Sequence, residues 1–246
     1  METKLLIITG SLFTFGALLI ALSHKPRKPE SSQKAIDWTK YGVYLILVVS
    51  LLLSAYCGRW FMAAILGAVA IGGSIELYRS LQNRSTFSFS MSLALFFVVT
   101  VCLGHLLLGN ATTWFSTFAF VFLLVATTDS FSQLWGKLLG NHKLCPHLSP
   151  GKTQEGLLGG FVSAAAVSSL LGFLLPGATL LQLIGLGITT AASATGGDLF
   201  FSYIKRKIVI KDFSGILPGH GGILDRFDSL IVAAPVSYWT RLLLLN

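Results

Sequence analysis

Charged residues are scarce in this sequence of 246 residues: they make up only 11% of it, whereas hydrophobic residues make up 53%. Soluble globular domains carry about 25% charged residues, so the composition excludes an ordinary soluble enzyme. It also excludes an intrinsically disordered chain, because disordered chains are poor in apolar residues. The mean hydropathy of +0.74 indicates a protein that places most of its apolar surface in a lipid bilayer.

Cysteine is also rare, and its placement excludes two further classes. The three cysteines are Cys57, Cys102 and Cys145, and no two of them form a CxxC pair. This pattern excludes a zinc-binding module and a disulfide-rich secreted scaffold. We find no internal repeat either, which argues against a transporter built from two related halves.

Basic residues outnumber acidic ones, with 18 Lys and Arg against ten Asp and Glu and a net charge of +8. In a soluble protein this excess would favour nucleic acid as the partner. In an apolar chain it points instead to membrane topology and to anionic lipid headgroups, so we expect no nucleic acid partner.

Long apolar runs follow one another through the chain, and a helix needs about 20 residues to cross a bilayer. They predict an all-α, polytopic integral membrane protein with about eight transmembrane helices. The predicted spans are Leu5–Leu22, Tyr41–Tyr56, Trp60–Leu77, Ser90–Leu108, Ala111–Thr127, Leu157–Leu175, Ala178–Thr195 and Leu230–Leu245.

The connections between these spans are short on one side of the membrane and long on the other. The short ones are turns at Gly58-Arg59, Gly109-Asn110 and Pro176-Gly177. The long polar ones are His24–Lys40, which we interpret as a flexible connector, Ser80–Phe89, Asp129–Gly156 and Gly196–Ser229. The long side holds every Lys and Arg except Lys4, Arg59 and Arg241. We therefore place it in the cytoplasm and expect the active site at that face.

Several of the few acidic residues gather near the C-terminal end of the chain. Asp198 follows two glycines and an apolar run, so it lies at the end of a membrane helix or inside its continuation. A carboxylate there needs a partner. Asp225 and Asp228 are three residues apart and share one face if this segment is helical. Carboxylates on facing helices suit Mg²⁺, which combines a few of them with substrate phosphate and water.

Glycine and basic residues accompany these carboxylates. Gly221 and Gly222 follow His220 just before the Asp225 segment, where backbone N–H groups can approach an anion closely. Cations suited to phosphate are Lys205, Arg206 and Lys211. Each feature alone also fits a solvated cytoplasmic loop, but together they indicate a site that handles phosphate groups.

Residues 202–228 resemble the signature of phosphatidate cytidylyltransferases, also called CDP-diacylglycerol synthases. The matching pattern is Ser202-Tyr-Ile-Lys205-Arg206, four residues, and then Lys211-Asp212-Phe-Ser214-Gly-Ile-Leu-Pro218-Gly-His220-Gly221-Gly222-Ile-Leu-Asp225-Arg226-Phe-Asp228. A second matching segment contains Asp129, Gly136, Gly140 and Ser149-Pro150-Gly151-Lys152-Thr153-Gln-Glu155-Gly156, and closes with Gly159-Gly160. The resemblance covers residues 125–235, with Glu76 as a further point.

The resemblance implies a reaction in which the phosphate of phosphatidic acid attacks CTP to give CDP-diacylglycerol and pyrophosphate. It implies an all-helical, Mg²⁺-dependent membrane enzyme that forms a homodimer, with a monovalent cation such as K⁺ beside the Mg²⁺. The partners are then CTP, phosphatidic acid and membrane lipids. We accordingly divide the chain into N-terminal transmembrane hairpins, residues 1–125, and a C-terminal catalytic membrane region, residues 126–246. A bacterial inner membrane is the expected location.

The resemblance, together with the residue types themselves, predicts the members of the site, and Lys152 with the Ser149–Thr153 turn is a hypothesis from the residues alone. The metal ligands are Asp198, Asp225 and Asp228. The catalytic set adds Lys205, Arg206 and Lys211. The substrate-binding residues are Ser149, Lys152, Thr153, Ser202, Asp212, His220, Gly221, Gly222 and Arg226.

Several alternatives stay open. The Ser149–Thr153 turn either brings Lys152 to CTP or pyrophosphate, or it caps the helix that follows, since the GxxxxGK[ST] spacing is absent. Asp129 either caps a helix or belongs to the site, and Glu76 either snorkels or pairs with Arg79.

Departures from the family pattern leave the substrate open as well. Gly151 stands where the family commonly has lysine, and Ser132-Gln133 and Gly136-Lys137 stand where it has Ala-Tyr and Gly-Arg. The alternatives are a divergent paralogue acting on another lipid, a CTP-dependent polyprenol kinase, and a non-catalytic lipid transporter.

Overall fold

Helices make up most of the chain that the computed structural model describes, which is residues 2–23, 31–82, 98–108, 113–216 and 221–245. Their bounds are α1 (Glu2–Ser23), α2 (Ser31–Cys57), α3 (Arg59–Gln82), the 3-10 turn η1 (His105–Leu107), α5 (Trp114–Leu139), α6 (Gln154–Leu170), the 3-10 turn η2 (Leu171–Leu174), α7 (Leu180–Lys207) and α8 (Leu224–Leu245). Residues 98–104, ahead of η1, are also helical. Two short strands, β1 (Lys143–Cys145) and β2 (Ser149–Thr153), form an antiparallel hairpin. The predicted all-α class is confirmed apart from this hairpin.

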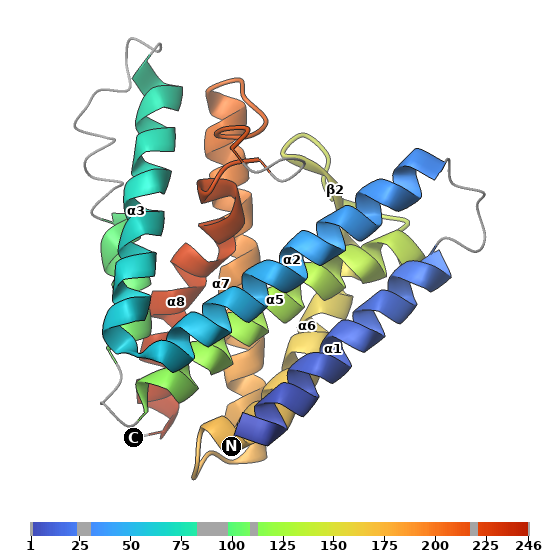
Figure 1. The fold of residues 1–246 in the computed structure, drawn as a ribbon. Coiled ribbons are helices and arrows are strands. Elements are labelled where there is room, and N and C mark those ends of the chain that lie inside the picture. Colours follow the sequence, from blue (N-terminus) through green and yellow to red (C-terminus); the bar gives the residue numbers. More distant parts are fainter. Residues whose placement is uncertain (1, 24–30, 83–97, 109–112, 217–220, 246) are drawn as a thin grey trace.

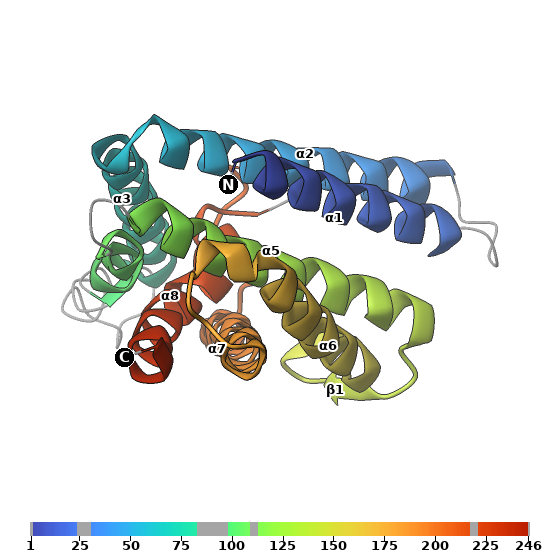
Figure 2. The ribbon, with the colours of Figure 1, turned by 90° about the horizontal axis from the view of Figure 1, so that it is seen from below.

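The helices are stacked in layers around α5 (Figures 1 and 2). Helices α1 and α2 run side by side and cover one side of α5, while α6, α7 and α8 lie on the other. Helix α3 stands beside this stack and contacts both α2 and α8. Of the described helices α5 is the most enclosed, because partners on both sides bury most of its apolar residues.

Four of the described helices are long and apolar enough to cross a membrane: Arg59–Gln82, Trp114–Leu139, Gln154–Leu174 and Leu180–Lys207. Two shorter apolar helices are Thr3–Leu18 and Tyr41–Cys57. Large apolar side chains face outward from several of these helices, with Leu6 exposed by 74% and Leu181 by 79%. Such surfaces need lipid around them, so the chain is a membrane protein. The count of eight spans stays a prediction.

Tight turns join the helices at the end of the bundle where both chain termini lie (Figure 1). Gly58 at φ 132° separates α2 from α3, and Gly177 at φ 90° precedes α7. These backbone angles favour glycine, so both predicted turns are confirmed. Thr179 then starts α7 with a capping box, because Thr179 and Gln182 exchange side chain–backbone hydrogen bonds. The predicted turn at residues 109–110 lies outside the described residues.

Several predicted boundaries were wrong, two of them in α2 and α5. The expected flexible connector His24–Lys40 is helical from Ser31 onward, because α2 begins there and no proline or glycine interrupts it up to Lys40. Residues 24–30 lie outside the described part of the chain. Helix α5 continues beyond the predicted end at Thr127 as far as Leu139. It therefore carries Asp129 within a helix rather than at its end.

Glycines bring α5 and α6 into close contact. A Cβ added to Gly156 would lie 2.5 Å from the carbonyl oxygen of Ser132 and 3.1 Å from the Cα of Gly136. One added to Gly160 would overlap the hydroxyl of Ser132. The backbone of α5 cannot move away without shifting the whole helix, so these positions fix how α6 and the hairpin lie against α5.

We expect Gly156→Ala to destabilise the protein by about 1–3 kcal/mol, the usual effect of overpacking against groups that cannot yield. Thermal unfolding of the purified protein in detergent measures this as a lower Tm. Gly67→Ala is the matched control on α3, because a Cβ there meets nothing within 4 Å. Equal Tm values for the two variants would contradict the close packing of α5 and α6.

Candidate functional site

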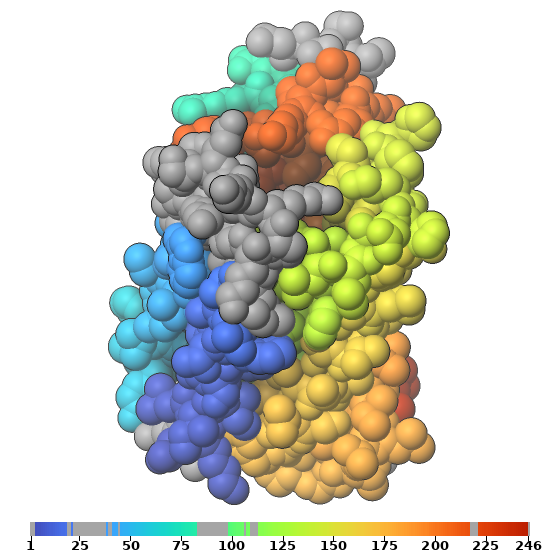
Figure 3. Space-filling model, turned by 90° about the vertical axis from the view of Figure 1, so that its right-hand side faces the viewer, coloured from blue at the N-terminus to red at the C-terminus, as the bar shows by residue number. Residues whose placement is uncertain are grey.

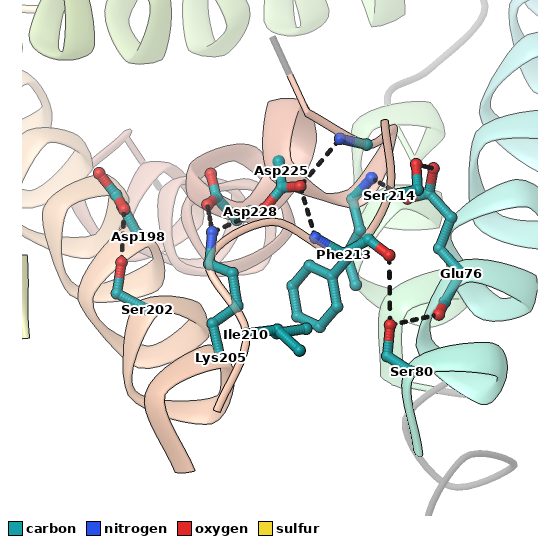
Figure 4. A network of polar contacts seen from close by, with 12 residues as sticks. Glu76, Ser80, Asp198, Ser202, Lys205, Ile210, Phe213, Ser214, Asp225 and Asp228 are labelled. Atoms are coloured by element: carbon teal, nitrogen blue, oxygen red, sulfur yellow. Dashed lines mark hydrogen bonds and ion pairs between the residues drawn. The ribbon is translucent and has the colours of Figure 1, made fainter. Parts of the chain in front are cut away.

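Carboxylates meet a lysine where α7 ends and α8 begins (Figure 4). Helix α7 runs past the predicted end at Thr195 as far as Lys207, which puts Asp198 inside its continuation. Asp198, Ser202 and Lys205 follow one another at helical spacing and line one side of α7. A Cβ on Gly197 would lie 2.8 Å from the carbonyl oxygen of Asp228, so this glycine allows α7 and α8 to approach.

Asp225 is the most heavily bonded of these carboxylates. Its Oδ1 accepts a hydrogen bond from Lys205 Nζ at 2.7 Å. Its Oδ2 accepts from the backbone N–H groups of Phe213 and Gly222, both at 2.9 Å. The side chains of Asp225 and Lys205 are 3% and 11% exposed, so this is a buried ion pair. Asp225 thus holds the loop between α7 and α8 against both helices.

Asp228 lies one turn further along α8 and has fewer partners. Its Oδ2 is 3.9 Å from Lys205 Nζ, and its Oδ1 accepts from the backbone N–H of Ser229 at 2.8 Å. Lys205 therefore faces both carboxylates of α8, as the i, i+3 spacing predicted. The Phe213 ring centre lies 5.5 Å from Lys205 Nζ and adds a cation–π contact.

A second group of charges surrounds Asp198. Its Oδ2 pairs with Lys152 Nζ at 2.7 Å, and its Oδ1 accepts from the Ser202 hydroxyl at 3.3 Å. Asp129 on α5 is half-buried near this group, where it interacts electrostatically with Asp198 and Lys152. Because Asp129 lies inside α5, it does not cap a helix, and its role in the site stays a prediction. The signal in the sequence was a lone acid beyond an apolar run.

The hairpin brings Lys152 to this group. Thr153 accepts a hydrogen bond from the backbone N–H of Gly156 and caps α6, so the capping interpretation is confirmed for that residue. Lys152, the residue before it, points to Asp198, while Ser149 lies opposite Cys145 in the hairpin. Arg206 donates to the carbonyl oxygen of Leu148 at 3.2 Å and thereby ties the end of α7 to the hairpin.

The remaining predicted site residues lie at the margin of the cluster or outside the described residues. Lys211, Asp212 and Arg226 are exposed. Gly221, at φ 79°, lies beside Asp212 and Asp225, and a Cβ there would be 2.8 Å from Oδ2 of Asp225. The backbone N–H of Gly222 donates a hydrogen bond to Oδ2 of Asp225. His220 lies outside the described residues.

Glu76 on α3 is a site neighbour that the sequence analysis did not assign. It is 2% exposed and neither snorkels nor pairs with the exposed Arg79. Its carboxylate accepts hydrogen bonds from the Ser214 hydroxyl at 2.6 Å and from the backbone N–H groups of Ile223 and Leu224 at 2.9 Å. The pattern that could have pointed to Glu76 is a single acidic residue close to the end of an apolar run.

The site opens into a hollow on the molecular surface (Figure 3). The hollow lies between the end of α7 with the loop after it, in orange, and the end of α5 with the hairpin, in yellow-green. Within the described residues, no three His, Cys, Asp or Glu side chains lie close enough to hold a metal ion by themselves. Mg²⁺ commonly uses one or two carboxylates together with substrate phosphates, and the oxygens of Asp198 and Asp228 are donors of that kind.

Known proteins are similar to this chain in sequence. Residues 19–244 match the family model described as the cytidylyltransferase family. A phosphatidate cytidylyltransferase of Staphylococcus aureus strain COL is 33% identical over 192 residues, which cover 77% of this chain and 74% of that protein.

Two further relatives match shorter segments at higher identity. A phosphatidate cytidylyltransferase of Rickettsia bellii is 43% identical over 126 residues, covering 48% of this chain and 54% of the relative. An uncharacterized Escherichia coli K12 protein, YnbB, is 44% identical over 120 residues, covering 49% of this chain and 40% of YnbB. The chain thus spans about half the length of these two relatives. Because the family model covers nearly the whole chain, the protein belongs to the cytidylyltransferase family.

Proposed function

We propose that this protein is a phosphatidate cytidylyltransferase, which converts CTP and phosphatidic acid into CDP-diacylglycerol and pyrophosphate in phospholipid biosynthesis. Family membership and two relatives that carry this name support the proposal. The observation that carries it is the cluster of Asp198, Asp228, Lys152 and Lys205 at one end of apolar helices. Such a site can hold a charged headgroup and a nucleotide while acyl chains stay in the bilayer.

The reaction is a displacement at phosphorus. An oxygen of the phosphatidate phosphate forms a bond to the α-phosphorus of CTP, and the bond from that phosphorus to the oxygen bridging to the β-phosphorus breaks. Pyrophosphate leaves with the electron pair of that bond. The attacking phosphate is already an anion, so a strong base is unnecessary, and the main obstacle is repulsion between two polyanions.

The lysines of the cluster reduce the repulsion between the two polyanions. Lys152 and Lys205 place fixed positive charge beside the carboxylates of the cluster, and the exposed Arg226 adds to it. Fixed charges of this kind stabilise charge that develops during the transfer. Mg²⁺, when bound, neutralises charge on the triphosphate and on the leaving pyrophosphate. We propose Asp198 and Asp228 as its ligands, with Asp225 holding Lys205 and the start of α8 in place, and a monovalent cation such as K⁺ beside it.

We further propose that the site faces the cytoplasm of a bacterial inner membrane and that the chain crosses it eight times. Figure 1 supports this topology, because both termini lie at one end of the bundle, as an even number of crossings requires. The hairpin, the end of α7 and the start of α8 lie at the other end, with their basic residues. The homodimer is proposed on the family resemblance alone.

The proposal is tested by incubating the purified protein in detergent with Mg²⁺ and CTP labelled at the α-phosphate. We expect label in the lipid fraction with phosphatidic acid but none with diacylglycerol, which lacks the attacking phosphate. Chelation of Mg²⁺ by EDTA should stop the transfer. Label that stays in the aqueous phase with phosphatidic acid would contradict the proposed function.

Lys152→Met separates nucleotide binding from stability. The ion pair of Lys152 with Asp198 is about one-quarter exposed on each side, so it contributes about 1 kcal/mol or less to stability. A hydrogen bond to a charged phosphate contributes about 1.5–3 kcal/mol, so we expect the KM for CTP to rise roughly 10- to 100-fold while Tm is nearly unchanged. An unchanged KM would show that Lys152 serves only the ion pair.

A further inference from the structure

The start of α8 is held by a residue from a distant part of the chain. The first helical residue of α8 is Leu224, and the residue before it, Ile223, has no side-chain oxygen that could cap the helix. Asp225, the acid in the first turn, gives both of its oxygens to Lys205, Phe213 and Gly222. The N–H groups of Ile223 and Leu224 are donated to Glu76 instead.

The chemistry of this contact suits a carboxylate. Oε1 of Glu76 accepts from Ser214 and Ile223, and Oε2 accepts from Leu224. A negative charge at a helix N-terminus is also favoured by the helix dipole. Since Glu76 is 2% exposed, these bonds are not weakened by water.

The surrounding residues are fitted to the same carboxylate. A Cβ on Gly222 would lie 2.5 Å from Oε2 of Glu76, so only glycine leaves room for it. One turn further along α3, the Ser80 hydroxyl approaches the carbonyl oxygens of Glu76, at 2.9 Å, and Phe213, at 3.2 Å. Figure 4 shows Glu76 and Ser80 on one side of the loop and the charged cluster on the other. Helix α3 therefore forms hydrogen bonds with both the loop and the start of α8.

We propose that Glu76 is a positioning residue, which sets the direction of the first turns of α8 and thereby places Asp228 in the charged cluster beside Lys205. This inference rests on the proposed function, because it assigns Asp228 to the metal. Glu76 touches neither substrate nor metal in this proposal. It acts through the backbone of Ile223 and Leu224, which precede the two acids of α8.

Glu76→Gln tests the proposal with almost no change of volume. One amide oxygen can replace Oε1, but the amide NH₂ group then faces the N–H of Leu224, donor against donor. Loss of an outer support of this kind costs roughly 10- to 100-fold in metal affinity or activity. We expect the half-saturating Mg²⁺ concentration to rise by that factor. Ser214→Ala, which removes one bond to the same carboxylate, should shift it in the same direction by less.

Ser74→Ala is the matched control, because its hydroxyl bonds only to Ala70 within α3. Hydrogen–deuterium exchange provides a readout that needs no activity: amides of residues 221–226 should exchange faster in Glu76→Gln than in wild type. A wild-type Mg²⁺ dependence in Glu76→Gln, or unchanged exchange there, would overturn the proposal. Wild-type protein without any transfer would overturn the proposed function, and the exchange measurement would still decide whether Glu76 holds α8.

Discussion

Asp225→Asn is expected to abolish measurable cytidylyl transfer and to lower Tm sharply, whereas Asp228→Asn should abolish transfer with little change in Tm. The oxygens of Asp225 are all engaged within the protein, by Lys205 and by the N–H groups of Phe213 and Gly222. Asparagine can keep the two backbone bonds through its carbonyl oxygen. Its NH₂ group then faces the ammonium group of Lys205, which loses its nearest counter-charge and keeps only Asp228 at 3.9 Å.

Removing one partner of a buried ion pair costs about 3–5 kcal/mol, which is the loss we expect for Asp225→Asn. Asp228 is different, because its distance to Lys205 is 3.9 Å and its main partner is the neighbouring Ser229. Both substitutions should lower the rate by about 100-fold or more, the effect of losing one main electrostatic group in an active site. Thermal unfolding and the lipid-labelling assay measure the two effects separately. Equal losses of stability in both variants would contradict the different roles given to the two acids.

Lys205→Met is expected to be as damaging as Asp225→Asn, and the two substitutions together should restore stability without restoring activity. Methionine has nearly the length of lysine but no charge, so Asp225 and Asp228 both lose their shared cation. In the double variant both members of the buried pair are neutral, and Asp228 keeps its hydrogen bond from the backbone N–H of Ser229. Replacing both members of a buried ion pair is often neutral for stability.

The three variants form a thermodynamic cycle in which the double variant is more stable than the sum of the single losses predicts. Activity should stay at the level of the single variants, because the cation that neutralises phosphate is missing. Tm values and rates of the four proteins, wild type included, give the result. Strictly additive losses of stability would show that the side chains of Lys205 and Asp225 have no energetic interaction.

The residues that carry the charges could be identified in the sequence because they are local features. Asp198 behind two glycines and the i, i+3 pair of Asp225 and Asp228 stand out in a chain with ten acidic residues. Their helices were also foreseen, although the apolar runs ended at Thr195 and began at Leu230 while α7 continues to Lys207 and α8 starts at Leu224. Hydropathy marks the lipid-covered part of a helix and misses its polar extension.

Contacts between distant segments could not be foreseen. Glu76 lies 147 and 148 residues before its backbone partners Ile223 and Leu224, and nothing in either local pattern connects them. The hairpin was also missed, because its strands are too short to give a periodic pattern. Its contact with the rest of the site, the ion pair of Lys152 with Asp198, joins segments that are distant in the sequence. Periodicity describes single elements, while these contacts depend on how the helices pack.

The most direct test of the central claim compares CTP labelled at the α-phosphate with CTP labelled at the γ-phosphate, using phosphatidic acid and Mg²⁺. With wild-type protein we predict that the α-label enters the lipid and the γ-label appears in pyrophosphate. With Asp228→Asn we predict neither labelled lipid nor labelled pyrophosphate. The γ-label in a lipid product would indicate a kinase, and undiminished transfer by Asp228→Asn would show that the chemistry does not take place at the cluster between α7 and α8.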